Sequence, residues 1–526
     1  MRKALSSWDI LAQPLFRSVW VASFASNIGT WIQNTGAAWV MTSLTTSPFS
    51  IALLQTAMSV PVFLLGLPAG ALADIVDRRK LLIFAQLEML VAAALLALLT
   101  FAHVVSPSIL IFLTFLLGIG NALALPAWIA AVPETVERKD LGKSLALNSV
   151  SYNAALAVGP ALAGIVLGVG AGWVFVLNAA SFVGVIYALW RWKRKPTPSS
   201  LPSEELITAM KAGYRYLRYS PLLQNVVIRT GIFTACGSVF WGLFPSLARF
   251  SLHASSLSFG VLYGFMGFGT IVAATVLPQV QANISIDKRV VATSCMYAFG
   301  LLLLVFAPNV FVAYAAMAIL GFSWLLTISS FNVYVQSIVA GWVKARAIGV
   351  YMLVLQGGLA FGALLWGSVA SATGIAAAFC MAAIGLIASA GGAYIWPLYT
   401  DKKIDVAYSF HWPEPEVMPD IDHERGPVLI TNKYEVATHD EERFLAAIGK
   451  LKGVRLRDGA ISWGVFRDTE RMDRFIENFI VESWAEHMRQ HVRATLTDKA
   501  LEEQVHQFTK DKKPPVTLHY IAEDYS

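Results

Sequence analysis

Charged side chains are scarce in this chain of 526 residues, where they make up 14% of the total, against about 25% in ordinary soluble domains. Hydrophobic residues make up 56%, a composition that argues against a soluble enzyme. The three cysteines, Cys236, Cys295 and Cys380, lie in apolar stretches, and no CxxC or Cys/His spacing indicates a disulfide framework or a zinc site. The phosphate-binding pattern GxxxxGKS/T is also absent, which argues against an ATP-driven pump.

The few charges are divided unevenly along the chain. Residues 1–399 contain 22 Lys and Arg against 10 Asp and Glu, a net charge of +12, whereas residues 400–526 contain 18 against 24, a net charge of −6. The basic residues form short clusters between apolar segments instead of one binding face, so we expect no nucleic-acid partner. The N-terminus lacks a compact apolar core with a small-residue cleavage site, so we expect no removable signal peptide.

Long apolar segments recur throughout residues 1–399. A helix that crosses a bilayer needs about 20 mostly apolar residues, because its backbone groups must all be bonded internally. Twelve segments meet this requirement: 15–43, 49–73, 80–103, 107–131, 143–169, 172–191, 222–249, 257–280, 289–307, 310–339, 346–371 and 375–398. The sequence therefore predicts an all-α membrane protein with twelve transmembrane helices.

Lys and Arg occur in alternate connections between these spans. Basic clusters such as Arg78–Lys80 and 191–195 follow the even-numbered spans, whereas the other connections hold only Arg249, near the end of the seventh span. Because basic loops stay on the cytoplasmic side, we expect a multi-pass protein of the inner cell membrane with both termini in the cytoplasm.

Two breaks in composition divide the chain into parts. Residues 193–221 are expected to form a cytoplasmic linker and an interfacial helix, which join a six-helix half, 1–192, to a second half, 222–399. Prolines mark a second linker, 400–427, and a separate cytoplasmic domain is expected at 428–526.

A short motif, GALADIVDRRK, follows the second span at residues 70–80. It resembles the loop motif between the second and third helices of the major facilitator superfamily, within which the chain looks like the bacterial exporters of enterobactin and macrolides. Contacts of these side chains with helix ends and carboxylates would latch two bundles in one state and break in the other. The alternative is that the basic residues are topology signals only. The residues expected to gate are Gly70, Asp74, Asp77, Arg78 and Arg79.

A second motif lies in the fifth span, where Gly159, Pro160 and Gly164 resemble the Gly-Pro motif of exporters in that superfamily. Glycine removes side chains from the helix surface and proline deletes a backbone donor, so this span is expected to approach a neighbour closely and to bend. The second half repeats the glycines at 362 and 367, which fits the parallel repeats of one transporter class. Plain helix packing without gating explains the motif equally well.

Glu88 is the carboxylate placed well inside a predicted span, about two turns into the third. An acid in that position is costly and is by default functional, so we hypothesise that Glu88 or Asp74 contributes to proton coupling. The alternative is a structural role, in which Glu88 pairs with Asn or backbone near the cytoplasmic face.

Polar and aromatic side chains form a stripe in the first span, where four residues recur at i, i+3, i+4 and i+7. The resemblance implies that spans one, four, seven and ten line a central pore. For a lone Asn or Trp, packing between helices or anchoring at the membrane surface is the commoner role. The candidates for the substrate cavity are Asn27, Thr30, Trp31, Asn34, Asn121, Trp128, Asn148, Tyr152, Trp241, Thr327, Tyr334 and Gln356.

The C-terminal region has the pattern of a small α+β domain. Strands are predicted at 428–437, 460–466 and 515–522, and helices at 441–451, 471–479 and 498–508. This order resembles the dimeric ferredoxin-like barrel of antibiotic-biosynthesis monooxygenases, with residues 482–491 as its signature. The resemblance implies dimerisation through this domain.

His487 and His491 stand four residues apart, with Glu486 nearby, so a metal or acid–base site is one reading, and a solvated or dimer-facing helix is the other. No HExxH order is present, and monooxygenases of that type need no metal. We therefore expect no metal, no cofactor and no catalytic residue.

Together these features predict a secondary active transporter, not an enzyme. It is expected to export small amphipathic or hydrophobic molecules, such as a siderophore, drug or antibiotic, across the lipid bilayer by alternating access coupled to the proton gradient. The alternative hypothesis is a membrane-tethered enzyme or sensor in which the C-terminal domain acts and the bundle delivers ligand.

Overall fold

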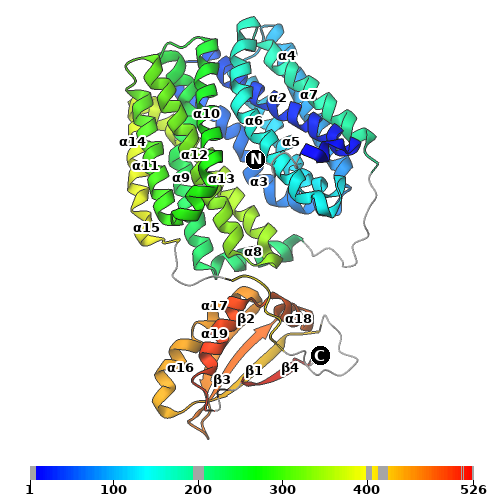
Figure 1. The fold of residues 1–526 in the computed structure, drawn as a ribbon, viewed down its shortest axis with the longest axis vertical. Helices are drawn as coiled ribbons and strands as arrows, with labels where there is room; N and C mark the ends of the chain where they lie inside the picture. The colour runs from blue at the N-terminus through cyan, green and yellow to red at the C-terminus, as the bar shows by residue number, and fades with distance from the viewer. Residues whose placement is uncertain are drawn as a thin grey trace. The chain divides into compact units, whose positions relative to one another are not determined.

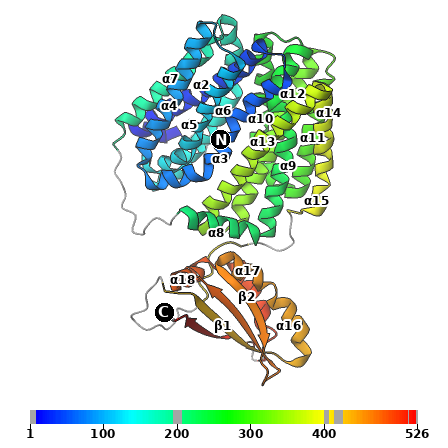
Figure 2. The same ribbon diagram turned by 180° about the vertical axis from the view of Figure 1, so that it is seen from behind.

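The fold is described from a computed structural model (Figures 1 and 2). It describes residues 8–193, 206–398, 405–412, 425–510, 512 and 514–523, without a few side chains, among them that of Asp74.

Long helices dominate the first 395 residues, and twelve of them form a bundle in the described part of the chain. They begin and end within three residues of the predicted spans, except that the last one breaks at Gly391 into two pieces. The bundle consists of α2 (Pro14–Leu44), α3 (Pro48–Ile75), α4 (Arg78–Phe101), α5 (Pro107–Ala131), α6 (Leu141–Val169), α7 (Gly172–Arg191), α9 (Pro221–Ser246), α10 (Ser256–Asn283), α11 (Ile286–Val305), α12 (Val310–Ile338), α13 (Lys344–Thr373) and α14 (Ile375–Ala390), with α15 (Gly392–Ile395) directly after it.

Shorter elements connect the long helices. A single turn, η1 (Trp8–Ala12), precedes the bundle, and α8 (Leu206–Arg218) lies between α7 and α9. The remaining turns are η2 (Val132–Thr135), η3 (Arg138–Asp140) and η5 (Gly341–Val343), and η4 (Leu247–Ser251) is a π-helical segment that continues α9.

Side-chain caps start several of the long helices. The side-chain oxygens of Ser47, Asp77, Ser106 and Ser255 each accept a hydrogen bond from the backbone N–H three residues further on. Such caps satisfy donors that have no partner inside the helix. The short connections between spans are therefore fixed by local sequence.

Eleven helices of the described chain are long and apolar enough to cross a membrane, by length and composition alone. The twelfth long helix, α2, is more polar but packs against α6 and α7 inside the bundle. Its Gln33 is buried and accepts a hydrogen bond from Nδ2 of Asn178 on α7 at 2.8 Å, so its polarity is matched by a partner.

The long helices fall into two groups of six. Figure 1 shows α2–α7, in blue to cyan, beside α9–α14, in green to yellow. Within the first group, α3 packs on α5 and α4 packs on α5 and α7. The first group has two apolar cores, one around Phe175 and Met41 and the other around Phe182 and Leu82.

The C-terminal domain is a four-stranded antiparallel sheet with helices (Figure 1). Its strands are β1 (Val428–Glu435), β2 (Ala460–Arg467), β3 (Arg474–Val481) and β4 (Val516–Ile521). Its helices are α16 (Glu441–Ile448), α17 (Leu451–Asp458), α18 (Trp484–Arg493) and α19 (Leu496–His506), and a turn, η6 (Thr438–Asp440), precedes α16. The strand order β2-β3-β1-β4, with helices after β1 and β3, is the predicted ferredoxin-like arrangement.

The predicted helix at 471–479 is wrong, because most of this segment forms strand β3. Its residues alternate between half-buried and buried, and Phe475, Glu477 and Phe479 point to the buried side. A strand is recognised in a sequence by alternating apolar and polar residues, and a charged residue at a core position interrupts this alternation. Glu477 is tolerated there because Arg455 of α17 neutralises it.

The chain divides into two compact units. The first comprises 1–206, 227–332 and 351–399, and so most of the helical bundle. The second comprises 207–226, 333–350 and 400–526. It therefore combines the C-terminal domain with α8, the turn η5 and the adjoining ends of α9, α12 and α13.

Candidate functional site

The Gly-Pro motif of α6 lies where the two groups of helices meet. A Cβ added to Gly164 would stand 2.8 Å from the Cα of Gly260 on α10, and a Cβ added to Gly260 would stand 2.6 Å from the Cα of Gly164. A Cβ on Gly267, two turns along α10, would collide with Ala157 in the same way. The two helices therefore touch backbone to backbone, and this contact joins the two halves of the bundle.

The other glycine of the motif faces the first helix of its own half. A Cβ on Gly159 would stand 2.5 Å from the Cβ of Trp31 on α2. The indole ring of Trp31 in turn lies 6.3 Å from that of Trp241 on α9, and Trp241 lies 5.4 Å from Trp324 on α12. The indole N–H of Trp241 is buried and makes no hydrogen bond within the described part of the chain. A row of tryptophans thus crosses from one half to the other.

Three further contacts join the halves. The hydroxyl of Thr56 on α3 donates a hydrogen bond to the backbone oxygen of Ala360 on α13 at 2.9 Å. The guanidinium of Arg249 lies 5.0 Å from the ring centre of Trp39, and its Nη1 lies 3.5 Å from the hydroxyl oxygen of Thr42. Cation–π contacts of this kind contribute about 0.5–2 kcal/mol.

These contacts share a position along the helices. One end of the bundle carries the basic connections, such as Arg78–Lys80 between α3 and α4, and we call it the basic end. The contacting residues of α3 lie at 49–63, those of α6 at 157–164 and those of α10 at 256–267. In each helix this is the portion away from the basic end. The halves are therefore joined toward the end opposite the basic connections.

The loop motif fastens helices of the first half to one another. Nη1 of Arg78 binds Glu134 at 2.7 Å, and the same side chain donates to the backbone oxygen of Ala130, at the end of α5. Arg79 donates to the backbone oxygens of Leu189 and Trp190 at 2.7 and 2.6 Å. Cations at the C-terminal end of a helix complement its dipole and its unpaired carbonyls.

The other members of the loop motif have different roles. Asp77 caps α4 by accepting a hydrogen bond from the N–H of Lys80 at 3.1 Å. A Cβ added to Gly70 would meet nothing within 4 Å. The side chain of Asp74 lies outside the described part of the structure. Its predicted gating and proton-coupling roles stay predictions.

The candidate cavity residues divide by environment. Asn27 donates to the hydroxyl oxygen of Ser151 on α6 at 3.2 Å, which links α2 to α6. Thr327 is fully buried and donates to Thr293 on α11 at 2.7 Å, so it binds its neighbouring helix. Trp128 packs against an apolar core of the first half.

The remaining cavity candidates differ in exposure. Asn121 and Tyr152 are exposed, and 55% of Tyr152 is accessible. The others are half-buried, namely Thr30, Asn34, Asn148, Tyr334 and Gln356. Among all the candidates, ring contacts join Trp31 and Trp241 across the two halves.

Glu88 points from α4 toward α5. A Cβ added to Gly120 of α5 would collide with one of its carboxylate oxygens, so the glycine makes room for the acid. Both carboxylate oxygens are buried and find no hydrogen-bond partner among the described side chains and backbone groups. A carboxylate placed in this way inside a membrane span is costly, which makes Glu88 a candidate functional residue.

One intramembrane ion pair was missed by the sequence analysis. Arg229 of α9 is 5% exposed and forms an ion pair with Asp287, the second residue of α11. Asp287 also accepts a hydrogen bond from the N–H of Leu398 at 3.0 Å. The sequence does indicate a buried charge here, because Arg229 interrupts an apolar span. Its partner could not be identified from the sequence, because Asp287 lies 58 residues away.

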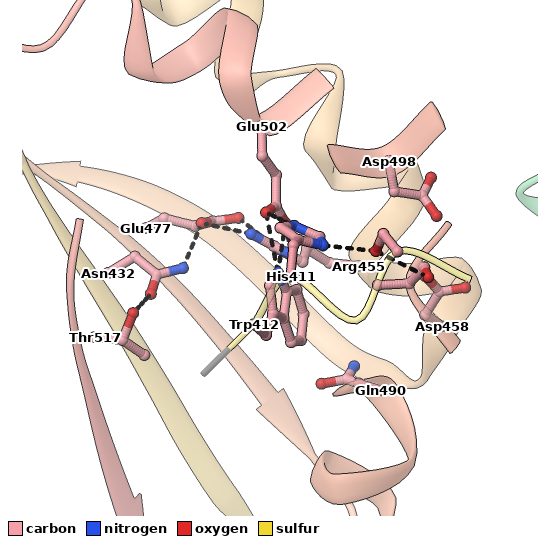
Figure 3. A network of polar contacts seen from close by, with 12 residues as sticks. His411, Trp412, Asn432, Arg455, Asp458, Glu477, Gln490, Asp498, Glu502 and Thr517 are labelled. Carbon is pink, nitrogen blue, oxygen red and sulfur yellow. Dashed lines mark hydrogen bonds and ion pairs between the residues drawn. The ribbon is translucent and has the colours of Figure 1, made fainter. Parts of the chain in front are cut away.

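The C-terminal domain holds a buried network of charges (Figure 3). Nε of Arg455 lies 3.1 Å from Glu477, and its Nη1 lies 2.7 Å from Glu502. Burial alone would raise the pKa of Glu502, but Arg455 and His411 outweigh it and hold the pKa at about 2. Glu477 also accepts hydrogen bonds from Asn432 and Tyr434. The carboxylates are therefore ionised and firmly held.

A segment before the domain joins this network. Nε2 of His411 lies 2.7 Å from Glu502, and the indole of Trp412 donates to the same carboxylate at 3.0 Å. Tyr408 pairs with Thr495 as an isolated bridge. Residues 405–412 are thus held on the domain that follows them, as Figure 3 shows for His411 and Trp412.

The histidines of α18 lie buried or half-buried among other aromatic rings, those of Trp412, Trp484 and His519. His487 is 1% exposed, and its Nε2 lies 3.3 Å from that of His491. Burial and neighbouring histidines lower the pKa of His487 to about 3 and that of His491 to about 4. Both rings are therefore neutral at pH 7. Within the described residues, no group of three or more His, Cys, Asp or Glu side chains is arranged to hold a metal ion.

Comparison with known proteins gives a consistent result. The profile of one family, described as transmembrane secretion effector, matches residues 5–526. The staphyloferrin A transporter of Staphylococcus aureus is 25% identical over 376 residues, which cover 70% of this chain and 92% of that protein. The enterobactin exporter of Salmonella typhi is 26% identical over 392 residues, which cover 71% and 90%.

Solved structures share the fold of the bundle at low sequence identity. The nucleoside transporter NupG superposes with a TM-score of 0.56 at 12% identity, covering 73% of this chain and all of that one. A bacterial homologue of the human lysosomal transporter Spinster gives 0.55 at 14% identity, covering 73% and 95%. These comparisons lend no support to the alternative of a membrane-tethered enzyme.

Proposed function

Because the chain belongs to the transmembrane secretion effectors of the major facilitator superfamily, we propose that it exports a small amphipathic molecule of the siderophore class. Relatives that it resembles are a staphyloferrin A transporter and an enterobactin exporter. The chain is a multi-pass transporter, and alternating access is the mode of transport that we infer for it.

The backbone contact between Gly164 and Gly260 carries this proposal. It joins the halves through glycine surfaces, which form no directional bond, so it can open and close at low cost. Alternating access needs such a bistable contact between two rigid bundles. In the state described, the halves meet away from the basic end, which is the arrangement that admits substrate from the side of the basic connections.

The row of Trp31, Trp241 and Trp324 supports an aromatic substrate. Stacked or edge-on aromatic pairs add about 0.5–1.5 kcal/mol beyond area burial. The free indole N–H of Trp241 supplies one donor for an acceptor on the substrate. Catecholate and related siderophores present both features, a ring and acceptor oxygens.

Export is tested by measuring how much substrate cells retain. Cells with and without the protein are loaded with radiolabelled catecholate and carboxylate siderophores, with a protonophore as control. We expect lower retention of one class when the protein is present, and loss of the difference with the protonophore. Equal retention of every compound would contradict the proposal.

We assign proton coupling to Glu88, whose buried carboxylate has no partner among the described groups. The test is Glu88→Gln, with Glu137→Gln in the exposed connection after α5 as the matched control. We expect proton-driven export to fall at least tenfold in the first variant and to persist in the second. Undiminished export by Glu88→Gln would remove this assignment.

The basic connections support an orientation with both termini in the cytoplasm of a cell whose inner membrane the protein spans. Reporter fusions distinguish the alternatives. A fluorescent protein that folds only in the cytoplasm is expected to fluoresce when it is fused after residue 526. A periplasmic phosphatase fused at the same place is expected to be inactive.

The C-terminal domain offers an apolar sheet surface for a second copy of the chain. Phe466 and Tyr520 are 57% and 51% exposed, and Ile476 and Ile480 are half-buried on the side of β3 away from the core. Light scattering of the purified full chain measures its mass, and the change Phe466→Lys is expected to convert dimer into monomer. A monomeric wild-type chain would exclude this dimer.

A further inference from the structure

Two helices from opposite halves of the bundle face each other at two levels. At the first level, the rings of Trp31 on α2 and Trp241 on α9 lie 6.3 Å apart. Eight residues further along, the guanidinium carbon of Arg249 in η4 lies 5.0 Å from the ring centre of Trp39 on α2. Eight residues are about two helical turns, so the second level lies nearer the end opposite the basic connections. We call Trp39 and Arg249 the outer pair.

Aromatic rings connect the two levels. A chain of ring contacts runs from Trp241 to Trp39, with ring centres 4.9–5.5 Å apart. It passes through three fully buried rings, Phe240, Phe244 and Phe259. The row of tryptophans and the outer pair therefore belong to one packed layer. A molecule that moves outward from the row along α2 and α9 has to part the outer pair.

The segment that presents Arg249 is shaped to reach the first half. η4 is π-helical, and the N–H of Leu252 donates to the backbone oxygen of Leu247, five residues back, at 3.0 Å. Such π turns are rare and are frequent at functional sites. Phe250, the neighbour of Arg249, packs on the apolar core of the first half that contains Met41. Two successive side chains of this segment thus contact the opposite half.

The outer pair is held by contacts that an anion can replace. The guanidinium of Arg249 lies over the ring of Trp39, and its Nη1 makes a long hydrogen bond of 3.5 Å to the hydroxyl oxygen of Thr42. A guanidinium pairs with a carboxylate through two parallel charge-assisted bonds, which are shorter and stronger than bonds to neutral groups. A carboxylate that reaches the outer pair therefore offers Arg249 better partners than Trp39 and Thr42 do.

We propose that Trp39 and Arg249 form the outer gate of the export pathway, and that the gate opens when a carboxylate of the substrate replaces the ring of Trp39 at Arg249. This inference rests on the export function proposed above and adds to it the charge that the substrate carries. The row of tryptophans receives the ring of the substrate, and Arg249 receives its carboxylate. The sequence has no other Lys or Arg in the connections at this end, so a departing anion meets a single cation there. A neutral aromatic molecule stacks at the row but leaves the gate closed.

The test measures the separation of α2 and η4 in the full chain, purified in detergent. In a chain whose native cysteines are replaced by alanine, spin labels are attached through Ser43→Cys and Ser251→Cys, at exposed positions near the outer pair. Pulsed electron paramagnetic resonance reports the distance between them. The probes are 2,3-dihydroxybenzoate and 2,3-dihydroxybenzamide, which share a catechol ring and differ in the carboxylate. We expect the benzoate to raise the population with a long distance about threefold and the benzamide to leave it unchanged. No response to the benzoate, or equal responses to both probes, would overturn the exchange at Arg249.

Variants of the outer pair test the gate itself. Arg249→Gln and Trp39→Leu each remove one side of the pair, so the long distance should become about threefold more populated without a probe. Arg249→Gln should also abolish the response to the benzoate, whereas Trp39→Leu should keep it. Trp39→Phe retains a ring and should keep the closed distance. The matched control is Trp173→Leu on α7, whose ring contacts Phe101 of its own half, and it should change nothing.

Failure of the gate can be told apart from failure of the export proposal. If the spin labels respond as expected but cells retain siderophores equally with and without the protein, the gate stands and the export proposal is wrong. If export is found but Arg249→Gln and Trp39→Leu both leave the distance unchanged, the outer gate is wrong.

Discussion

The contact between the two halves of the bundle and the core of the C-terminal domain depend on different interactions. In the bundle, Gly164 meets Gly260 backbone to backbone. In the domain, Arg455 is held by Glu477 and Glu502 through charge-assisted bonds. The glycine contact has no directional bond to break, and the hydrogen bond of Thr56 that also joins the halves is a single one, whereas the ion pairs of the domain leave an unpaired buried charge if they open. We infer that movement is confined to the bundle and that the domain acts as a rigid body.

The surroundings explain why the bundle uses small residues at its contacts and the domain uses buried ion pairs. Between membrane helices, lipid supplies no hydrophobic driving force, so close packing of small residues holds the helices together. A domain in water can bury ions when every lone pair is satisfied, although the charges stabilise it little against an apolar core. The comparison therefore predicts that charge removal harms the domain and added bulk harms the bundle.

The largest effect is expected from Arg455→Met in the C-terminal domain. Removing one partner of a buried ion pair leaves the other charges buried without a countercharge. This lowers the free energy of unfolding by about 3–5 kcal/mol. Hydrogen exchange of β1–β4 in the full chain measures it. Arg443→Met, at an exposed position on α16, is the control and should leave exchange unchanged. Equal exchange in both variants would contradict a role for the network.

Acid should loosen the domain through His487 and His491. Their pKa values fall from about 6.5 when unfolded to about 3 and 4 when folded, so folding favours the neutral rings. This stability is complete above pH 6.5 and is lost as the pH falls toward 4. From pH 7.5 to 5 we expect a loss of about 2 kcal/mol from the buried ring of His487 and a smaller further loss from His491, whose ring is only half-buried. A domain whose hydrogen exchange, corrected for intrinsic rates, is unchanged at pH 5 would exclude this effect.

In the bundle, Gly164→Leu is expected to reduce export at least tenfold. The new side chain would collide with the backbone of Gly260, and overpacking costs about 1–3 kcal/mol. Gly168→Leu is the matched control, since a Cβ at Gly168 on the same helix meets nothing within 4 Å. Similar export by the two variants would mean that the glycine contact is irrelevant to transport.

The smallest effect is expected from Thr56→Val. This change removes the hydrogen bond to the backbone oxygen of Ala360 that joins the halves. Hydrogen bonds between membrane helices average about 0.6 kcal/mol, so the export rate should change about two- to threefold. A tenfold change would show that the contact between halves depends on directional bonds after all.

Much of the bundle could be predicted because its helices are encoded locally. Apolar length sets each span, and caps such as Ser47 and Ser106 set its start. The partners of the Gly-Pro motif could not be predicted, because Gly164 meets Gly260 across 96 residues of chain. The same holds for Arg229, whose partner Asp287 lies on another helix.

The C-terminal domain shows where pattern reasoning fails. Strand β3 was predicted as a helix because Glu477 occupies a core position, and its neutralising partner Arg455 comes from α17. Residues 400–427 are predicted as a linker, and the contacts of His411 and Trp412 with Glu502 are ones that the linker composition does not indicate. Both features depend on contacts that form only after folding.

The most direct test of movement between the halves is a cross-link at their contact. A Cβ on Gly242 of α9 would stand 3.3 Å from the Cβ of Ala52 on α3, within reach of a disulfide. In a chain whose native cysteines are replaced by alanine, Ala52→Cys with Gly242→Cys should export normally when reduced and stop when oxidised, while either single variant is unaffected. Full export by the oxidised, cross-linked protein would contradict alternating access at this contact.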